Sequence, residues 1–309
     1  MRLKLLACKV LQREISLLMA QSGHFIDVTY IRQDFHNTPQ LLNSFLQEEI
    51  NKLDGGTDQY TCPEPFDAIL LGYGLCSNAV TGIKSSRYKL VIPRAHDCIT
   101  FLLGSREAYD YHFNKNPGTY WYSTGWVENV KMPSKNRLEE IRSEYIETYG
   151  EENAQYLMEM EHNWVKDYHT AGFVNWKGIN SDYAQQFTKE SALSLKWDYR
   201  QYDGHPGYLE NFLNATWDPD YFLILEPGQT AEQSYDQKVI KIKSWNTIVT
   251  IARITVLYYW LFVPFFMNYR FRCFCMVDRG YVAECLFNGC LSKWFHNVIS
   301  GFIWMNTIC

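Results

Sequence analysis

Three cysteines follow three apolar segments that are typical of β-strands, and sulfur chemistry is the first function that they indicate. Cys8 closes RLKLLAC, Cys76 lies in the loop GYGLCSN, and Cys98 ends PRAHDC. The carboxyl ends of parallel strands meet at one edge of a sheet, and neighbouring strands are about 4.8 Å apart. We therefore expect the three thiols to converge, with the glycine-flexed loop presenting the sulfur of Cys76 to a shared site.

Converging thiols have three main uses. Zn²⁺ takes Cys and His ligands tetrahedrally, and Cys8, Cys76 and Cys98, with His96 as an alternative ligand, match a catalytic site that keeps one position open. Cys76 and Cys98 also precede expected helix starts, where the helix dipole lowers a thiol pKa. Two such cysteines are able to exchange a substrate proton, as in a metal-free racemase or isomerase. Redox sensing needs only exposure.

Inert packing is the competing interpretation for each cysteine, because a free cysteine is among the most buried residue types. The spacing of the three cysteines also lacks the CxxC pattern of common zinc sites. The hypothesis of a shared site therefore depends on the joint placement of the thiols at strand ends.

Other residues at the strand ends are candidates to bind a substrate. Arg94 directly follows a strand, where a guanidinium can grip a carboxylate or phosphate, although a surface salt bridge is equally compatible. We assign Cys76 and Arg94 as the candidate catalytic residues. Asp97 is expected to cap the helix that follows it. Tyr73 and Trp126 are candidates to wall a pocket, with core packing as the alternative.

Strands and helices alternate along most of the chain, which predicts an α/β fold with a parallel sheet. We expect an open, Rossmann-like, doubly wound domain over residues 1–240, either as one unit or as two related halves, 1–130 and 131–240. The segment 38–53 is the clearest helix, because Thr38 is suited to the N-cap and Pro39 to the first helical position. The glycines of LGYG and DGHPG do not form a GxGxxG or P-loop pattern, so nucleotide binding has no support.

The C-terminal extension, residues 241–309, has a different character. Residues 248–267 are apolar apart from Arg253, Pro264 and two threonines, and the run is long enough to span a bilayer. Three interpretations stay open: a membrane anchor, a buried helix of an ordinary domain, and a coding artefact that is not a native part of the fold.

Composition narrows the classes of function. The chain has 309 residues, of which 47% are hydrophobic, and its net charge is −5. It contains no long basic stripe, so broad binding of nucleic acid is not expected. The N-terminus does not resemble a secretory signal, which predicts a cytoplasmic protein with reduced cysteines, membrane-associated only if the extension anchors it.

Several motifs together resemble one known family. LLAC, LLGYGLCSN, PRAHDCITFLLGSREAY, PGTYW followed by TGW, and WDPDYFLILEPG are similar to domain-of-unknown-function family 1638. The resemblance covers residues 3 to about 229, and Cys8, Cys76 and Cys98 occupy family-like positions. Members occur mainly in anaerobic archaea and bacteria, often encoded near corrinoid-dependent methyltransferases, which implies one-carbon or methyl-transfer metabolism.

The expectation from residues and resemblance together is a zinc thiolate protein, and more specifically a methyltransferase-related or cysteine-dependent enzyme. A corrinoid would enter only through a partner, either a corrinoid protein or a methyltransferase. Two alternatives stay open. One is a non-catalytic accessory protein that docks on the corrinoid methyltransferase system with its cysteines merely packed, and the other is the metal-free racemase or isomerase.

Overall fold

Five mostly apolar segments pair into the larger sheet of the computed structural model, which describes residues 1–56 and 64–243. The strands of this sheet are β1 (Arg2–Cys8), β2 (Phe25–Ile31), β3 (Ala68–Gly72), β4 (Lys89–Pro93) and β8 (Phe222–Leu225). Their order is β2-β1-β3-β4-β8, and only β8 is antiparallel to its neighbour. Every residue of β3 is buried, as expected for a central strand covered on both faces.

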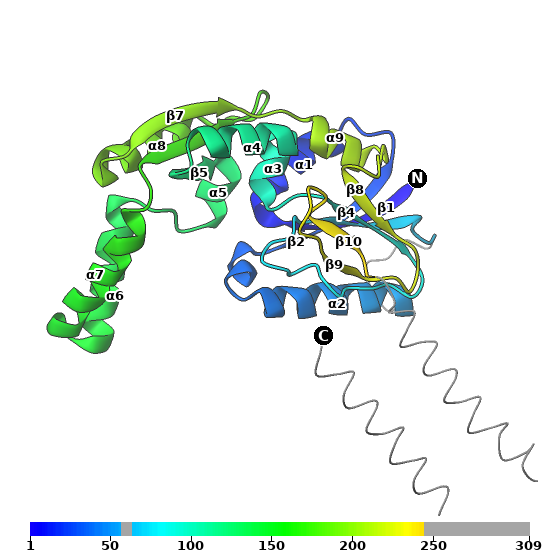
Figure 1. Ribbon diagram of the computed structural model, residues 1–309, viewed down its shortest axis with the longest axis horizontal. Coiled ribbons are helices and arrows are strands. Elements are labelled where there is room, and N and C mark those ends of the chain that lie inside the picture. The colour runs from blue at the N-terminus through cyan, green and yellow to red at the C-terminus, as the bar shows by residue number, and fades with distance from the viewer. Residues whose placement is uncertain (57–63, 244–309) are drawn as a thin grey trace, which may run out of the picture. The chain divides into compact units, whose positions relative to one another are not determined.

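Helices cover both faces of this sheet (Figure 1). They are η1 (Lys9–Leu11), α1 (Gln12–Met19), η2 (Gln33–Asn37), α2 (Pro39–Gly55), α3 (Cys98–Leu103) and α9 (Gly207–Leu213). Figure 1 shows α2 on one face and α1, α3 and α9 on the other. The buried residues of α2 recur at helical spacing and seal the sheet: Leu42, Leu46, Ile50 and Leu53. The predicted α/β fold with a mostly parallel sheet is confirmed.

A second sheet contains three parallel strands in the order β5-β6-β7. Its elements are β5 (Thr119–Ser123), β6 (Thr170–Asn175) and β7 (Asp198–Asp203), with α4 (Arg106–Lys115), α5 (Thr124–Asn129) and α8 (Asp182–Leu195) around it. Hydrophobic patterns predicted these strands but not their partners, because the pattern reports which face is buried and not which neighbour covers an edge. For the same reason the antiparallel direction of β8 was not predicted.

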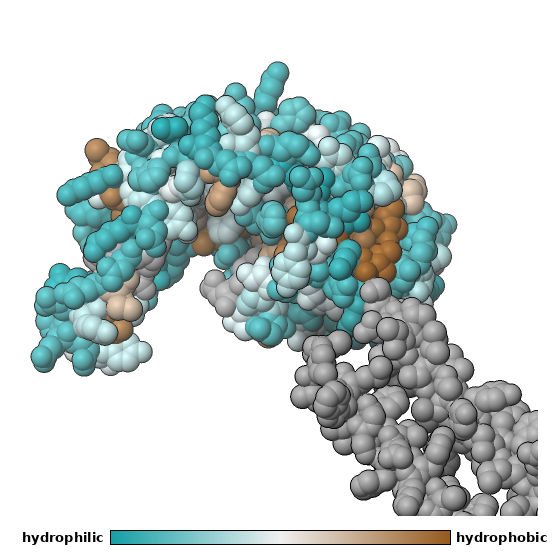
Figure 2. Space-filling view, viewed as in Figure 1, coloured by the Kyte–Doolittle hydropathy of each residue, from teal (hydrophilic) through white to brown (hydrophobic). Residues whose placement is uncertain are grey.

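Two further features complete the described chain. A hairpin of α6 (Lys135–Tyr149) and α7 (Glu151–Val165) lies between β5 and β6, as predicted, and its surface is largely hydrophilic (Figure 2). A short antiparallel ribbon of β9 (Ala231–Gln233) and β10 (Ile240–Ile242) follows β8, and three-residue strands carry too little pattern to be predicted.

Residues Met1–Lys243 form one compact unit. Within the described ranges, no helix combines the length and apolarity that crossing a bilayer requires. The predicted segment 248–267 and nearly all of the extension 241–309 lie outside the described residues. The domain boundary near residue 240 and the relation between the halves 1–130 and 131–240 stay predictions.

Candidate functional site

The carboxyl ends of β1 and β3 mark the point where the larger sheet changes its direction of winding. The chain runs from β1 outward to β2 and then crosses back to β3 on the other side of β1. In open α/β sheets, ligands bind outside the carboxyl ends of the strands at such a switch point. Cys8 is the last residue of β1, and Cys76 lies four residues beyond β3, so both thiol-bearing residues flank this position.

Backbone hydrogen bonds tie the loop after β3 to the loop after β4. The amide of Leu75 donates to the carbonyl oxygen of Ala95 at 2.7 Å, and the amide of Cys76 donates to that of His96 at 3.1 Å. Gly74 permits this approach, because a Cβ atom there would lie 2.8 Å from the Ala95 oxygen. The glycine in GYGLCSN therefore allows close packing of two loops, in addition to a turn.

Three consecutive residues with side chains adopt left-handed backbone conformations in this loop. The φ angles are 44° at Cys76, 55° at Ser77 and 70° at Asn78. For residues other than glycine this conformation costs about 1–2 kcal/mol each, and it is rarely adopted by successive residues. Such strain persists only where surrounding structure enforces it, and it clusters at functional sites. The strained turn thus singles out Cys76 independently of its chemistry.

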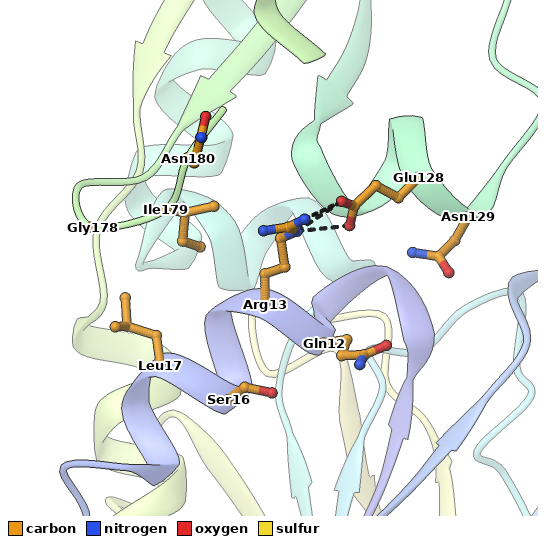
Figure 3. Close-up of a pocket in the computed structure, with 9 residues that line it drawn as sticks. All are labelled: Gln12, Arg13, Ser16, Leu17, Glu128, Asn129, Gly178, Ile179 and Asn180. Atoms are coloured by element: carbon orange, nitrogen blue, oxygen red, sulfur yellow. Dashed lines mark hydrogen bonds and ion pairs between the residues drawn. The ribbon is translucent and has the colours of Figure 1, made fainter. Parts of the chain in front are cut away.

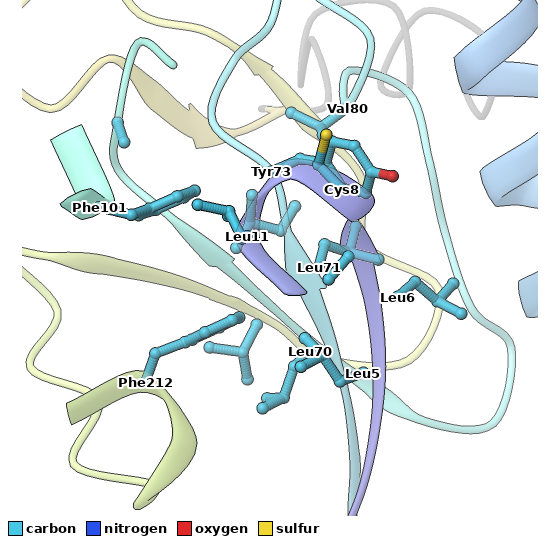
Figure 4. Packing of buried hydrophobic residues seen from close by; sticks show 14 of the residues in the cluster. Leu5, Leu6, Cys8, Leu11, Leu70, Leu71, Tyr73, Val80, Phe101 and Phe212 are labelled. Carbon is cyan, nitrogen blue, oxygen red and sulfur yellow. The ribbon is translucent and has the colours of Figure 1, made fainter. Parts of the chain in front are cut away.

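The three thiols, called the thiol cluster below, are all electrostatic neighbours of the buried Tyr73 side chain. Burial is the main reason that the pKa of the Tyr73 hydroxyl is raised well above its usual value. Each of Cys8, Cys76 and Cys98 also lies close enough to raise this pKa. Cys8 likewise raises the pKa of both other thiols, and Cys76 raises that of Cys98. Figure 4 shows Cys8 beside Tyr73 at the edge of the apolar core formed by the sheet and its helices. The three cysteines are thus neighbours of one tyrosine at one edge of the sheet, whereas their convergence on a shared site stays a prediction.

Burial keeps these thiols protonated at neutral pH. It raises the pKa of Cys8 from 9.0 to about 12, against a lowering by a hydrogen bond with the backbone at Val10. Burial, and then the charge of Asp97, raise the pKa of Cys76 and of Cys98 well above 9.0. We expected helix starts to lower both values, and this expectation was wrong. Desolvation of a thiolate outweighs the dipole of a short helix such as α3.

The Trp126 side chain, on the helix α5 that follows β5 of the second sheet, lies against the Cys98 thiol. Its helix, α5, packs so tightly on η1 that a Cβ atom on Gly125 would collide with the carbonyl oxygen of Val10. The buried indole Nε1 has no conventional hydrogen-bond partner in residues 1–56 and 64–243, yet it lies against the Cys98 thiol and lowers the pKa of that thiol. Tyr73 and Trp126, both candidates for a pocket wall, thus contact the cysteine cluster.

Asp97 caps α3, as predicted. Its carboxylate accepts hydrogen bonds from the amides of Ile99 at 3.0 Å and Thr100 at 3.4 Å. It also accepts one from the hydroxyl of Tyr109 at 3.2 Å. Burial raises the pKa of Asp97, and these hydrogen bonds oppose the rise. The carboxylate therefore links the thiol cluster to α4.

The side chains of Arg94 and His96 have surroundings that differ from those of the thiols. The guanidinium of Arg94 is buried and donates to backbone carbonyls, at 2.9 Å to Pro219, at 3.3 Å to Lys238, and also to Ile240. His96 is exposed, and its ring lies 6.5 Å from that of Tyr109 on α4. The substrate-binding role of Arg94 and the metal-binding role of His96 stay predictions.

The described part of the chain contains no group of three or more His, Cys, Asp or Glu side chains set to hold a metal ion. The donor types nevertheless fit zinc, since all three cysteines are free thiols, two of them buried and Cys76 partly buried. Their present placement does not fit, so metal binding would require the strained loop at Cys76 to adjust.

Apart from the thiol cluster, a pocket of about 450 Å³ lies between α1, α5 and residues 178–180 (Figure 3). Arg13 spans it, and its Nε donates to both carboxylate oxygens of Glu128, at 2.9 and 2.8 Å. The neighbouring Glu14 is 1% exposed. Sequence analysis missed this site, because nothing in the pattern of α1 indicates that a glutamate would face inward. Its main charges are paired with each other, so it is a weaker candidate than the thiol cluster.

Residues 30–213 match the model of a family described as a protein of unknown function, DUF1638. The chain belongs to the DUF1638 family. The matched range covers more than half of the chain and includes Cys76 and Cys98, whereas Cys8 precedes it, so the resemblance that we saw in the motifs is confirmed. No curated protein and no solved structure matches this DUF1638 chain.

Proposed function

We propose that this DUF1638 protein uses Cys8, Cys76 and Cys98 as a thiolate site for a thiophilic metal ion, with Zn²⁺ the best suited. The supporting observation is that Cys8, Cys76 and Cys98, which follow three neighbouring parallel strands, all lie near the buried Tyr73 side chain at one edge of the sheet. Three thiolate ligands with a fourth position open match the ligand count of catalytic zinc sites, and soft thiolates favour zinc over hard cations.

The strained turn and the raised pKa values fit this proposal in specific ways. The left-handed run from Cys76 to Asn78 stores conformational energy that a shift of the loop on metal binding would release. Because burial holds the thiols protonated, binding must displace protons, and apparent metal affinity must fall steeply with decreasing pH.

The proposal extends to one-carbon metabolism only through the family resemblance. Members are often encoded near corrinoid-dependent methyltransferases, so we place the site in anaerobic methyl transfer, with the corrinoid held by a partner protein. A bound zinc ion would supply Lewis acidity that activates a thiol for such chemistry. Three further parts belong to this proposal: a doubly wound, Rossmann-like classification of the larger sheet, a reducing cytoplasmic location, and membrane contact through residues 248–267.

Metal analysis of the full chain tests the proposal. The protein is purified anaerobically, its zinc content is measured by plasma mass spectrometry, and zinc affinity is measured by competition with a chelating dye. We expect stoichiometric zinc in the wild type and a large loss of affinity in Cys76→Ser and Cys98→Ser. His24→Gln removes a metal-ligating residue type outside the cluster and should leave the affinity unchanged.

Wild-type protein that takes up no zinc, or cysteine variants with undiminished affinity, would contradict the proposal. If Cys76→Ser then still bound a corrinoid methyltransferase normally, the accessory interpretation would replace it. If instead the metal-free protein incorporated solvent deuterium into a substrate, the racemase or isomerase interpretation would replace it.

A further inference from the structure

A polar pocket of about 560 Å³ lies between α4 and residues 233–239, which include the loop joining β9 to β10. Its volume is in the range of small-molecule sites. His96 and Thr100, each two residues from Cys98 in the chain, line it together with Tyr109. The hydroxyl of Tyr109 donates a hydrogen bond to the carboxylate of Asp97, whose charge acts on the nearby thiols. The pocket and the cysteines are thus connected through the partly buried carboxylate of Asp97.

Two buried polar atoms of this pocket's lining have no hydrogen-bond partner within the described ranges. One is the hydroxyl oxygen of Thr100, a residue that is 1% exposed, and the other is Nε of Arg106. A buried polar group without a partner costs free energy, so such groups are rare and require an explanation. A ligand that accepts from both donors would remove the penalty.

The guanidinium of Arg106 is available to an acidic ligand group. Its Nη1 donates to the carbonyl oxygen of Gln237 at 2.6 Å, and its carbon lies 5.1 Å from the ring centre of Tyr221. In residues 1–56 and 64–243 it forms no ion pair with a carboxylate, unlike Arg13, Arg137 or Arg142. Arginine without an acidic partner at a pocket wall is suited to a carboxylate.

Carboxylates on the same pocket wall restrict which ligand fits. Glu107, Asp110 and Asp236 line it together with Arg106. Asp236 already accepts a hydrogen bond from the amide of Lys238 at 2.8 Å, whereas Glu107 and Asp110 are exposed and have no ion-pair partner in the described part of the chain. One arginine against three carboxylates would repel a simple anion such as phosphate. A ligand that carries both a carboxylate and an ammonium group would pair with Arg106 and with the exposed carboxylates at the same time.

We propose that this pocket binds a small zwitterion of the α-amino acid class. The carboxylate accepts hydrogen bonds from Arg106 and Thr100, and the ammonium group faces Glu107 and Asp110. Tyr109 places the bound molecule next to Asp97 and therefore next to the thiol cluster. This inference does not depend on metal binding by the cysteines.

Calorimetric titration of the full chain tests the proposal. The probes are the common α-amino acids, each compared with the carboxylic acid that lacks its amino group and the amine that lacks its carboxylate, and inorganic phosphate. We expect at least one amino acid to bind, and both of its truncated counterparts to bind about tenfold more weakly or not at all. No binding by any amino acid, or equal binding by an acid, an amine or phosphate, would overturn the proposal.

Two variants locate the binding. Arg106→Gln should weaken binding of the amino acid about tenfold or more, whereas Arg142→Gln on α6 should not change it. Thr100→Val removes a hydroxyl that has no described partner, so thermal stability should be retained or increased while binding weakens. Retained stability together with weakened binding in Thr100→Val would identify a ligand contact rather than a structural role, even if Arg106→Gln fails to fold. Undiminished affinity in Thr100→Val, or in a folded Arg106→Gln protein, would overturn the assignment.

Discussion

The amide of Cys76 donates a hydrogen bond of 3.1 Å to the carbonyl oxygen of His96. This bond fastens the loop that carries one thiol to the segment that leads, two residues later, to Cys98. The two cysteines are far from Cys8 in sequence, yet parallel pairing of β1, β3 and β4 puts all three on one edge of the sheet. The thiol cluster is therefore a consequence of strand order and of one tight contact between loops.

Close packing at Gly74 should make this position intolerant of a side chain. In Gly74→Ala the new Cβ atom would lie 2.8 Å from the carbonyl oxygen of Ala95, so the two loops must separate. We expect a loss of about 1–3 kcal/mol in the free energy of unfolding, measured by urea denaturation. Gly23→Ala is the matched control, because no atom lies within 4 Å of its Cβ position. Equal effects of the two substitutions would contradict the described loop contact.

Strain in the left-handed turn should be relieved by glycine. Ser77 has a φ angle of 55°, which glycine adopts without steric cost, so Ser77→Gly should raise the free energy of unfolding by up to about 1 kcal/mol. Ser143→Gly in the middle of α6 should lower it by about 0.5–1 kcal/mol, because glycine disfavours helix interiors. The turn would not be strained as described if both variants lost stability in the same urea titration.

Buried thiols should destabilise the fold at alkaline pH. Above pH 9.0 cysteines ionise in the unfolded chain, whereas the Cys8 thiol of the folded chain stays protonated to about pH 12. The folded state then binds more protons, so stability falls with rising pH, by at most about 1.4 kcal/mol per pH unit for each such thiol. Cys8→Ala should make this fall shallower, as measured by urea denaturation across the range.

Val10→Ala is the control for that measurement, because it also truncates a buried side chain next to β1 but removes no titrating group. The free energy of unfolding of Val10→Ala should be lower than that of the wild type by a similar amount at every pH. An alkaline slope that is the same in Cys8→Ala as in the wild type would show that this thiol is not shielded from ionisation by burial.

Glu14 should make stability depend on pH near neutrality. Burial, reinforced by the charge of Glu128, raises its pKa from 4.5 to about 7, and its Oε2 has no hydrogen-bond partner in the described ranges. Between those values the unfolded chain has lost a proton that the folded chain keeps. Stability therefore falls as pH rises from 4.5 to 7, and the full deficit, about 3 kcal/mol, persists above that range.

Glu14→Gln should remove this dependence and should be more stable than the wild type above pH 7, by thermal or urea denaturation. Glu159→Gln, at an exposed position of α7, should leave the wild-type profile unchanged. A wild-type profile that is flat across the same range would mean that Glu14 is not held in the neutral form.

Particular residues show what the sequence could and could not reveal. Asp97 was predictable as a cap because its role is local, and the ends of β1 and β4 were predictable because apolar runs stop there. The location of the three cysteines at one edge of the sheet followed from the general rule that parallel strands end at one edge. These inferences require only local pattern and the direction of strands.

Other features depend on packing between distant segments. The contact of Trp126 with Cys98 arises because α5, after the first strand of the second sheet, packs on η1. The burial of Glu14 and the attachment of Arg94 to backbone carbonyls near residues 219–240 have the same origin. Hydrophobic periodicity reports which residues are buried but does not identify the surface that covers them, so these contacts could not be read from the chain.

X-ray absorption at the zinc edge of the zinc-loaded full chain tests the central claim most directly. A site formed by Cys8, Cys76 and Cys98 predicts three sulfur neighbours at about 2.3 Å from zinc in the wild type, and one fewer in Cys76→Ser. A zinc ion surrounded only by oxygen and nitrogen, or a sulfur count unchanged by that substitution, would contradict a shared thiolate site.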